Sequence, residues 1–324
     1  MRHWLSTGPL FWIFWLAITL VGCSDSDRRQ ETIKLGINLW PGYAPLNLAQ
    51  EIGARYSDRF ELVDLASTRE LLRGLAIGTL DGGGVTLPEL LNARDLGIDL
   101  VVVIITNTSS GADAIIAKPT FNSIADLKGH RIGCDPTTLC SLMISRAAET
   151  VQLTPEDFIT LPVLPAQHES AFSSNEVDAL VTFEPALTRL TELGGKIIFS
   201  SADIPNEIID VLVVKRSVIE SNPDILVQLS AMWSHATQYL SDNPEAALGL
   251  IDKRLKMGTK NLKEAFNGIS IPTEKQTQIL LSQRGAALHP TMARIEEIML
   301  QLGVISSSGS MDDFFLADTP SLKH

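Results

Sequence analysis

The sequence predicts an α/β protein of two lobes, with the second lobe inserted into the first. Short apolar runs alternate with segments of helical spacing along most of the chain. This alternation breaks at Asn107–Gly111 and then restarts with an apolar core of its own, and a last buried strand near Ile208–Val214 precedes a helical C-terminal part. Two crossover strands, near residues 108–114 and 206–212, would therefore join the lobes, and the cleft between them is the expected binding site.

The first 22 residues are expected to be an export signal. Leu10–Val21 is an apolar run of twelve residues behind a short basic start, which is too short to span a membrane. The run ends in LVGC at Cys23, which resembles the lipobox of bacterial lipoproteins. In those proteins the signal is cleaved before the cysteine, and the cysteine is then lipidated. Residues 23–31 are polar and are expected to tether the folded part to a membrane.

Charge argues against a nucleic-acid partner. The formal net charge is −12, and it becomes −13 without residues 1–22, which contain one basic residue. An acidic chain without a basic cluster is a poor candidate for nucleic-acid binding. No apolar stretch after residue 22 reaches membrane-spanning length.

Two cysteines remain, Cys134 and Cys140, in the segment GCDPTTLC. Outside the cytoplasm such a pair can form a disulfide. Free thiols packed in the core are the alternative, because a strand end and the next helix often diverge. The sequence leaves both interpretations open.

The stretch Ile33–Ala49 organises the first lobe. A short apolar strand ends at a turn containing Trp40 and Tyr43, with Pro41 and Gly42 between them, and a helix follows. A strand that ends in a turn before a helix N-terminus is where open α/β sheets bind ligands. The alternative is that the two aromatic side chains only cover the core.

Five further elements complete the first half. A strand is predicted at Phe60–Leu65, and a capping box at Ser67–Glu70 begins a helix. The glycine-rich strand Asp81–Thr86 lacks a following Gly-Lys-Ser/Thr, so close backbone approach explains its glycines better than a phosphate loop. A second capping box, Thr86–Glu89, begins another helix. Leu100–Ile105 is apolar throughout, as in a strand buried on both faces.

The second half alternates in the same way before it becomes helical. Helices are predicted to start at Asn222-Pro223, at Asn243-Pro244 and at the capping box of Thr273, and the residues from Ser306 onwards are expected to form a poorly packed tail. The strands predicted for the second lobe are 114–117, 131–134, 159–164, 177–183 and 197–199.

Five segments of the chain resemble one family. They are GINLWPGYAPLNLA, SSGADAIIAK, IADLKGHRIG, VDALVTFEP and EIIDVLVVKR. They occur in this order in substrate-binding proteins of ABC importers, of the nitrate/sulfonate/taurine and thiamine-precursor type (NMT1-like). The resemblance covers about residues 32–240.

This resemblance implies a type II periplasmic-binding-protein fold, with two α/β lobes joined by two crossover strands. The first lobe would comprise residues 32–110 and 212–324, and the second lobe residues 114–206. Such a protein is not an enzyme and needs neither a cofactor nor a metal. It would be lipid-anchored in the periplasm or at the cell surface, and would deliver a small molecule to an ABC permease and its ATPase.

Nine residues match the family's cleft positions, and each has a simpler explanation. Thr86 and Thr137 could be helix caps, Asp113 could form local hydrogen bonds, and Glu184 could be a solvated turn residue. Asp210 is the hardest to dismiss, because an unpaired carboxylate inside an apolar strand is costly. The nine positions are Trp40, Tyr43, Thr86, Ser110, Asp113, Thr137, Thr138, Glu184 and Asp210.

The chemistry of these residues favours a cationic or amine-bearing ligand, such as an aminopyrimidine or a quaternary ammonium compound. The nine include three carboxylates and two aromatic residues, and Arg69 is the only nearby cation. The alternative is an anion such as a sulfonate, taurine or nitrate, for which arginines, lysines or helix N-termini would be expected.

The sequence leaves two other functions open. A ligand-sensing partner of a membrane signalling protein would have the same fold. A pyrimidine-synthase-like enzyme is less well supported, because His168 and Glu169 are adjacent on a predicted helix and do not face each other. The sequence also lacks the spacings of common catalytic and metal-binding motifs.

Overall fold

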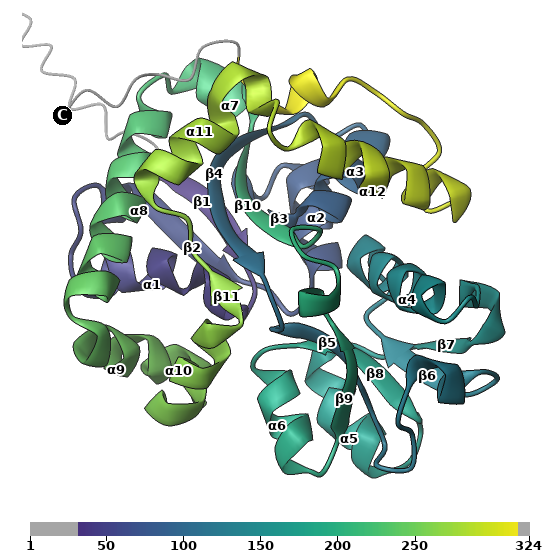
Figure 1. The fold of residues 1–324 in the computed structure, drawn as a ribbon. Coiled ribbons are helices and arrows are strands. Elements are labelled where there is room, and N and C mark those ends of the chain that lie inside the picture. Colours follow the sequence, from purple (N-terminus) through teal and green to yellow (C-terminus); the bar gives the residue numbers. More distant parts are fainter. Residues whose placement is uncertain (1–31, 317–324) are drawn as a thin grey trace, which may run out of the picture. The chain divides into compact units, whose positions relative to one another are not determined.

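The computed structural model describes residues 32–316, which form two mixed β-sheets with helices packed on them (Figure 1). The first sheet has six strands in the order β11-β4-β10-β3-β1-β2, and the second has five in the order β7-β6-β8-β5-β9. The predicted α/β fold class is therefore confirmed. The first sheet contains β1 (Ile33–Ile37), β2 (Phe60–Asp64), β3 (Gly82–Thr86), β4 (Leu100–Ser109), β10 (Ile209–Lys215) and β11 (Ile269–Ser270). The second contains β5 (Asp113–Ala117), β6 (Arg131–Cys134), β7 (Ile159–Pro162), β8 (Ala179–Phe183) and β9 (Lys196–Ser200).

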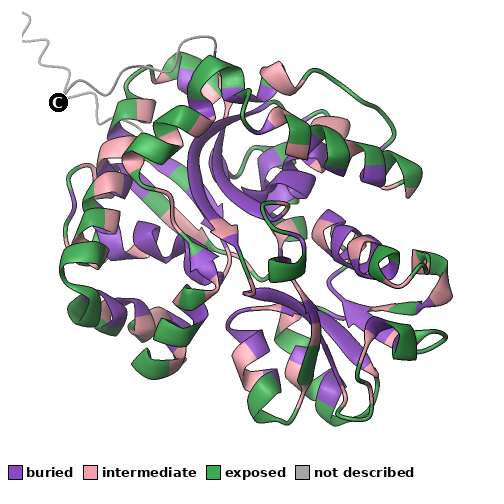
Figure 2. Ribbon diagram, in the orientation of Figure 1, coloured by how far each residue is buried: buried purple, intermediate pink, exposed green. Residues whose placement is uncertain are grey.

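The first sheet is covered by helices on both faces, and the alternation of side chains in β10 shows how. Val211 and Val213 pack with α2 (Thr68–Ile77), α3 (Leu87–Asp95) and α12 (His289–Gln301). Leu212 and Val214 pack with α1 (Ala44–Glu51) and α8 (Ile225–Asp242) on the other face. Because successive side chains of a strand point to opposite faces, an uninterrupted apolar strand requires this double cover. In Figure 2 the central strands are buried along most of their length.

The second sheet has its own helices. Phe172 of α5 (His168–Ser173) and Leu190 of α6 (Ala186–Glu192) pack on one side of the sheet. Met143 of α4 (Thr138–Thr150) belongs to the larger core on the other side. The remaining helices follow the last long strand and are α7 (Arg216–Ser221), α9 (Pro244–Leu255), α10 (Thr259–Asn267) and α11 (Glu274–Gly285). No helix between residues 32 and 316 combines the length and the apolar character needed to cross a membrane.

The chain passes between the sheets twice. β4 of the first sheet ends at Ser109, and β5 of the second begins at Asp113. On the return, β9 ends at Ser200 and β10 begins at Ile209. The two crossings contact each other, because the hydroxyls of Ser109 and Ser201 lie 2.8 Å apart and the Gly111 N–H donates to Ser201 Oγ at 2.6 Å.

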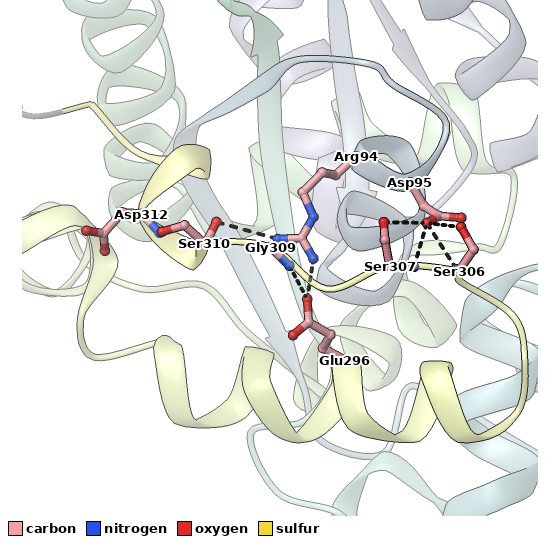
Figure 3. A network of polar contacts seen from close by, with 8 residues as sticks. All are labelled: Arg94, Asp95, Glu296, Ser306, Ser307, Gly309, Ser310 and Asp312. Atoms are coloured by element: carbon pink, nitrogen blue, oxygen red, sulfur yellow. Dashed lines mark hydrogen bonds and ion pairs between the residues drawn. The ribbon is translucent and has the colours of Figure 1, made fainter.

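The expectation of a poorly packed tail from Ser306 is wrong for residues 306–316. Ser306 and Ser307 both donate backbone and side-chain hydrogen bonds to Asp95, at 2.8–3.1 Å (Figure 3). These bonds hold the pKa of Asp95 below its usual value. Further along, Phe314 and Phe315 are buried. The sequence predicts a poorly packed tail here because the partner of these serines lies on α3, more than 200 residues earlier in the chain.

Candidate ligand-binding site

A small cavity, here called the central cavity, lies between the two sheets. One wall contains Trp40, Tyr43 and Asp210, from the part of the chain that forms the first sheet. The other wall contains Asp113 and Phe183 of the second sheet. The centres of water molecules can occupy about 40 Å³ of it, which is room for a few waters.

The structure brings six of the nine predicted site residues to this cavity: Trp40, Tyr43, Thr86, Asp113, Thr137 and Asp210. Three do not line it. Ser110 is exposed at the first crossing, and Thr138 is buried beside a separate surface groove. Glu184 is buried at the start of α6, where its carboxylate accepts hydrogen bonds from the backbone N–H and hydroxyl of Thr188 at 3.1 and 2.8 Å.

Trp40 and Tyr43 reach the cavity from the turn after β1. Pro41–Tyr43 forms a short 3-10 helix that leads into α1, and both aromatic side chains are buried. Gly84 allows this arrangement, because a Cβ at that position would lie 2.5 Å from Tyr43 Cζ. Close approach therefore explains this glycine of β3. Across the cavity, the Trp40 ring meets Phe183 edge to face, with ring centroids 6.1 Å apart.

Asp210 is at the centre of a hydrogen-bonded chain on this wall. The Tyr43 hydroxyl donates to Asp210 Oδ1 at 2.7 Å. With its amide oriented to satisfy its neighbours, Asn107 donates to Asp210 Oδ2 at 3.0 Å and accepts from the Trp40 indole N–H at 3.2 Å. Burial raises the pKa of Asp210 well above its usual value, and the nearby charge of Asp113 raises it further.

Thr86 and Glu89 extend the same wall. Thr86 ends β3 and caps α3, and its backbone N–H donates to the Glu89 carboxylate at 2.8 Å. The Thr86 hydroxyl is buried and has no hydrogen-bond partner among the described residues. Burial raises the pKa of Glu89 although this hydrogen bond opposes the shift. The Thr86–Glu89 capping box predicted from the sequence is therefore present, with Glu89 bonded to the Thr86 backbone.

Asp113 and Asp135 face the cavity from the second sheet. Asp113 begins β5, directly after the first crossing, and Asp135 follows β6. One carboxylate oxygen of each is buried without a partner in residues 32–316. Burial raises the pKa of Asp113 to about 7, with the charges of Glu89 and Glu184 adding to the effect. Burial also raises the pKa of Asp135, and the charge of Arg69 opposes this.

A disulfide joins Cys134 to Cys140, which decides between the two interpretations that the sequence left open. Cys134 ends β6, Cys140 lies in the first turn of α4, and their Cα atoms are 6.0 Å apart. We call residues 134–140 the disulfide loop. Its residues Asp135, Thr137 and Leu139 line the central cavity.

Several lining residues escaped the sequence analysis, chiefly Glu89, Asp135 and Phe183. Each had a signal beside it: Glu89 was in a predicted capping box, Asp135 lies between the two cysteines, and Phe183 precedes Glu184. Their side chains meet only because the two sheets face each other, which sequence spacing does not reveal.

The lining of the cavity is acidic and partly aromatic. Four carboxylates line it, and none of the described residues lining it is Lys, Arg or His. The Trp40 and Phe183 rings add aromatic surface, which attracts cations. Within residues 32–316, no group of three or more His, Cys, Asp or Glu side chains is arranged to hold a metal ion.

Two sheets linked by two crossings, with a polar cavity between them, define a two-lobed ligand-binding fold. The chain belongs to the NMT1-like family, whose model matches residues 26–251. A putative binding protein of Brucella abortus is 25% identical over 252 residues, which is 76% of this chain and 77% of that protein. A putative aliphatic sulfonates-binding protein of Escherichia coli K12 is 22% identical over 209 residues, or 64% of this chain and 66% of the relative.

Solved structures share the fold. The periplasmic aliphatic sulphonate binding protein from Escherichia coli matches with a TM-score of 0.73 at 18% identity, covering 89% of this chain and 93% of its own. The periplasmic nitrate-binding protein from Synechocystis PCC 6803 matches with a TM-score of 0.69 at 16% identity, covering 87% and 84%. The family resemblance and the periplasmic-binding-protein fold predicted from the sequence are thus confirmed. The named relatives are binding proteins, in agreement with the prediction that this chain is not an enzyme.

Proposed function

We propose that this protein is an extracytoplasmic solute-binding protein that captures a small cationic or amine-bearing molecule in the central cavity and delivers it to an ABC permease with its ATPase. Family membership and fold support the general role, because one relative and one structural neighbour are named as aliphatic sulfonate-binding proteins. The carboxylates and aromatic rings that line the cavity support a cationic or amine-bearing ligand.

One observation is the main support for a cationic or amine-bearing ligand. Three buried oxygens of cavity-lining residues, Thr86 Oγ1, Asp113 Oδ2 and Asp135 Oδ1, have no hydrogen-bond partner among residues 32–316. Two of the three belong to carboxylates, which can only accept when ionised. A ligand with N–H donors would satisfy them, and its positive charge would relieve the repulsion between the carboxylates. An anion would add to that repulsion.

The second candidate ligand is an anion such as a sulfonate, taurine or nitrate. The names of the relatives favour it, since several are described as sulfonate- or nitrate-binding proteins. Arg69 could supply positive charge for such a ligand; it reaches the disulfide loop from α2, where it donates to the Pro136 carbonyl oxygen at 3.4 Å.

Capture would require the two lobes to move. We propose a first lobe of residues 32–110 and 212–324 and a second of residues 114–206, which open and close about the paired crossings near 108–114 and 206–212. The edge-to-face contact of Trp40 with Phe183 crosses between these lobes, so opening would break it. Ligand that bridges both walls would favour the closed arrangement.

A binding screen tests the ligand class. Choline, ethanolamine and 4-aminopyrimidine would be compared with taurine, ethanesulfonate and nitrate by isothermal calorimetry. We expect binding within the first group, and at least tenfold weaker binding by Asp113→Asn and Asp210→Asn, because each variant removes a buried carboxyl that a cationic ligand would hold in its ionised form. Asp58→Asn, at an exposed position outside the cavity, is the matched control. Binding of a sulfonate or nitrate alone would replace this proposal with the anion alternative.

We also propose that Cys23 carries a lipid anchor, on the basis of the LVGC motif; Cys23 lies outside the described residues. In a bacterial host, the wild-type protein should partition with membranes, and Cys23→Ser should keep its signal segment or become soluble in the export compartment. Correct cleavage of Cys23→Ser with continued membrane partitioning would contradict the anchor.

A further inference from the structure

We infer that the Cys134–Cys140 disulfide is a positioning element of the central cavity. It holds the disulfide loop in the place where this loop closes the second wall, so that breaking the bond loosens the wall while the protein stays folded. The inference concerns the wall itself and does not depend on which ligand the cavity takes.

The position of the bond is the first argument. It connects the end of β6 to the first turn of α4, and so ties a sheet to a helix. Only five residues lie between the two cysteines, and three of them, Asp135, Thr137 and Leu139, line the cavity.

Apart from the disulfide, few hydrogen bonds hold the disulfide loop in place. The Thr137 side chain makes no capping hydrogen bond, and Asp135 Oδ1 and Thr138 Oγ1 are buried without partners among the described residues. The backbone bonds from Thr137 N–H to Asp135 O at 2.7 Å and from Ser141 N–H to Thr137 O at 3.3 Å are local. The first residue of the loop is also tied to the segment after β7, because the Val163 N–H donates to the Cys134 carbonyl oxygen at 2.8 Å. From the opposite wall the loop receives the exposed 3.4 Å hydrogen bond that Arg69 donates to Pro136.

The protein should survive loss of the bond. Reduction by dithiothreitol adds two electrons and two protons to the S–S bond, giving two thiols, while the dithiol closes to its own cyclic disulfide. Both sulfur positions are buried among apolar side chains of the main core, where a free cysteine packs as a small apolar residue. The loop would therefore lose its constraint without exposing new charge.

Amide hydrogen exchange, measured by mass spectrometry on the ligand-free full chain, tests the inference. In reduced protein we expect at least tenfold faster exchange of the amides of residues 137–141. We also expect a smaller acceleration on the opposite wall, in residues 66–69, because these residues meet the loop. Exchange in β4 and β10 should not change. The double variant Cys134→Ser with Cys140→Ser should reproduce this pattern, and dithiothreitol should have no further effect on it.

Two results would overturn the inference. Unchanged exchange on the opposite wall would mean that the bond matters only within its own loop. Equal acceleration in both sheets would mean that the bond stabilises the whole fold, without a special role at the cavity. If the Ser variant fails to fold, the reduced wild-type protein and a Cys134→Ala with Cys140→Ala variant still decide between these outcomes. A failed ligand screen would leave this experiment unaffected.

Discussion

The two walls of the central cavity are held by different kinds of bond. On the first wall, Asp210 is fixed by Tyr43 and Asn107, and Asn107 also accepts from Trp40. On the second wall, the disulfide loop is fixed by a covalent bond, and Asp113 and Asp135 each keep a buried oxygen without a partner in the described residues. Both carboxylate oxygens of Asp210 are thus hydrogen-bonded on the first wall, where the Thr86 hydroxyl is a buried group without a partner among the described residues. On the second wall it is carboxylate oxygens that lack partners.

This difference indicates how the cavity can be specific without being rigid throughout. A buried carboxylate without a partner is costly, so the second wall lowers the stability of the empty protein. A cationic ligand would recover part of that free energy when it satisfies Asp113. The hydrogen-bonded first wall would in turn keep Trp40 and Tyr43 in position before the ligand arrives, which reduces the entropy lost on binding.

The largest effect should come from removing the main side chain of the first wall. Trp40→Ala deletes a buried indole, and we expect a loss of about 3–5 kcal/mol in the free energy of unfolding, measured by urea denaturation. Trp233→Ala is a matched control, because Trp233 is equally buried in α8, away from the cavity. Both variants should lose stability, and only Trp40→Ala should also lose ligand affinity. Equal losses of affinity would show that Trp40 acts through stability alone.

The buried carboxyl of Asp113 on the second wall should make the free energy of unfolding depend on pH. The pKa of Asp113 is raised to about 7 in the folded protein, from the ordinary value of 3.8. The folded state thus binds more protons than the unfolded state between these values, so the ligand-free protein should lose stability as pH rises from 4 to 7. The loss due to Asp113 is at most about 4 kcal/mol and is complete above pH 7.

Asp113→Asn separates this contribution from those of the other carboxylates. Burial also raises the pKa of Glu89, Glu184 and Asp210, so the wild-type protein should become less stable over a wide range of pH. Urea denaturation at pH 4.5, 6 and 7.5 should show a shallower loss in Asp113→Asn, with the difference between the proteins growing up to pH 7. Parallel profiles would mean that Asp113 is satisfied in solution, and the proposed contrast between the walls would fail.

The sequence predicted features that depend on local contacts and missed features that depend on contacts between distant residues. Trp40 and Tyr43 were placed near the site because their position depends on the turn after β1, a local feature. The helix start at Ser67 was also local, and its side chain accepts from the Glu70 N–H as expected. By contrast, Asp135 and Phe183 reach the cavity only through the meeting of two sheets. Ser306 was misjudged because its partner, Asp95, is distant in sequence.

A moderate effect is expected from a single hydrogen bond of the first wall. Tyr43→Phe removes the hydroxyl that donates to Asp210 at 2.7 Å and leaves the ring in place. The loss should be about 1–3 kcal/mol, because Asp210 stays buried with one partner fewer. The double variant Tyr43→Phe with Asp210→Asn tests the coupling: its loss should be smaller than the sum of the two single losses. Additive losses would show that the two side chains do not depend on each other.

The smallest effect on stability should come from loss of the hydrogen bond that Arg69 donates to Pro136 between the two walls. Arg69 is exposed, and its 3.4 Å hydrogen bond to Pro136 is long and open to solvent. Arg69→Gln should therefore change the free energy of unfolding by less than about 1 kcal/mol. Its charge is near Asp135, whose pKa it holds down against the effect of burial, so its removal should raise that pKa further. A carboxyl-carbon NMR titration of Asp135 would measure this shift, with Arg73→Gln, an exposed neighbour on the same helix, as the control. If the Asp135 titration is the same in both variants, the charge of Arg69 does not act across the cavity.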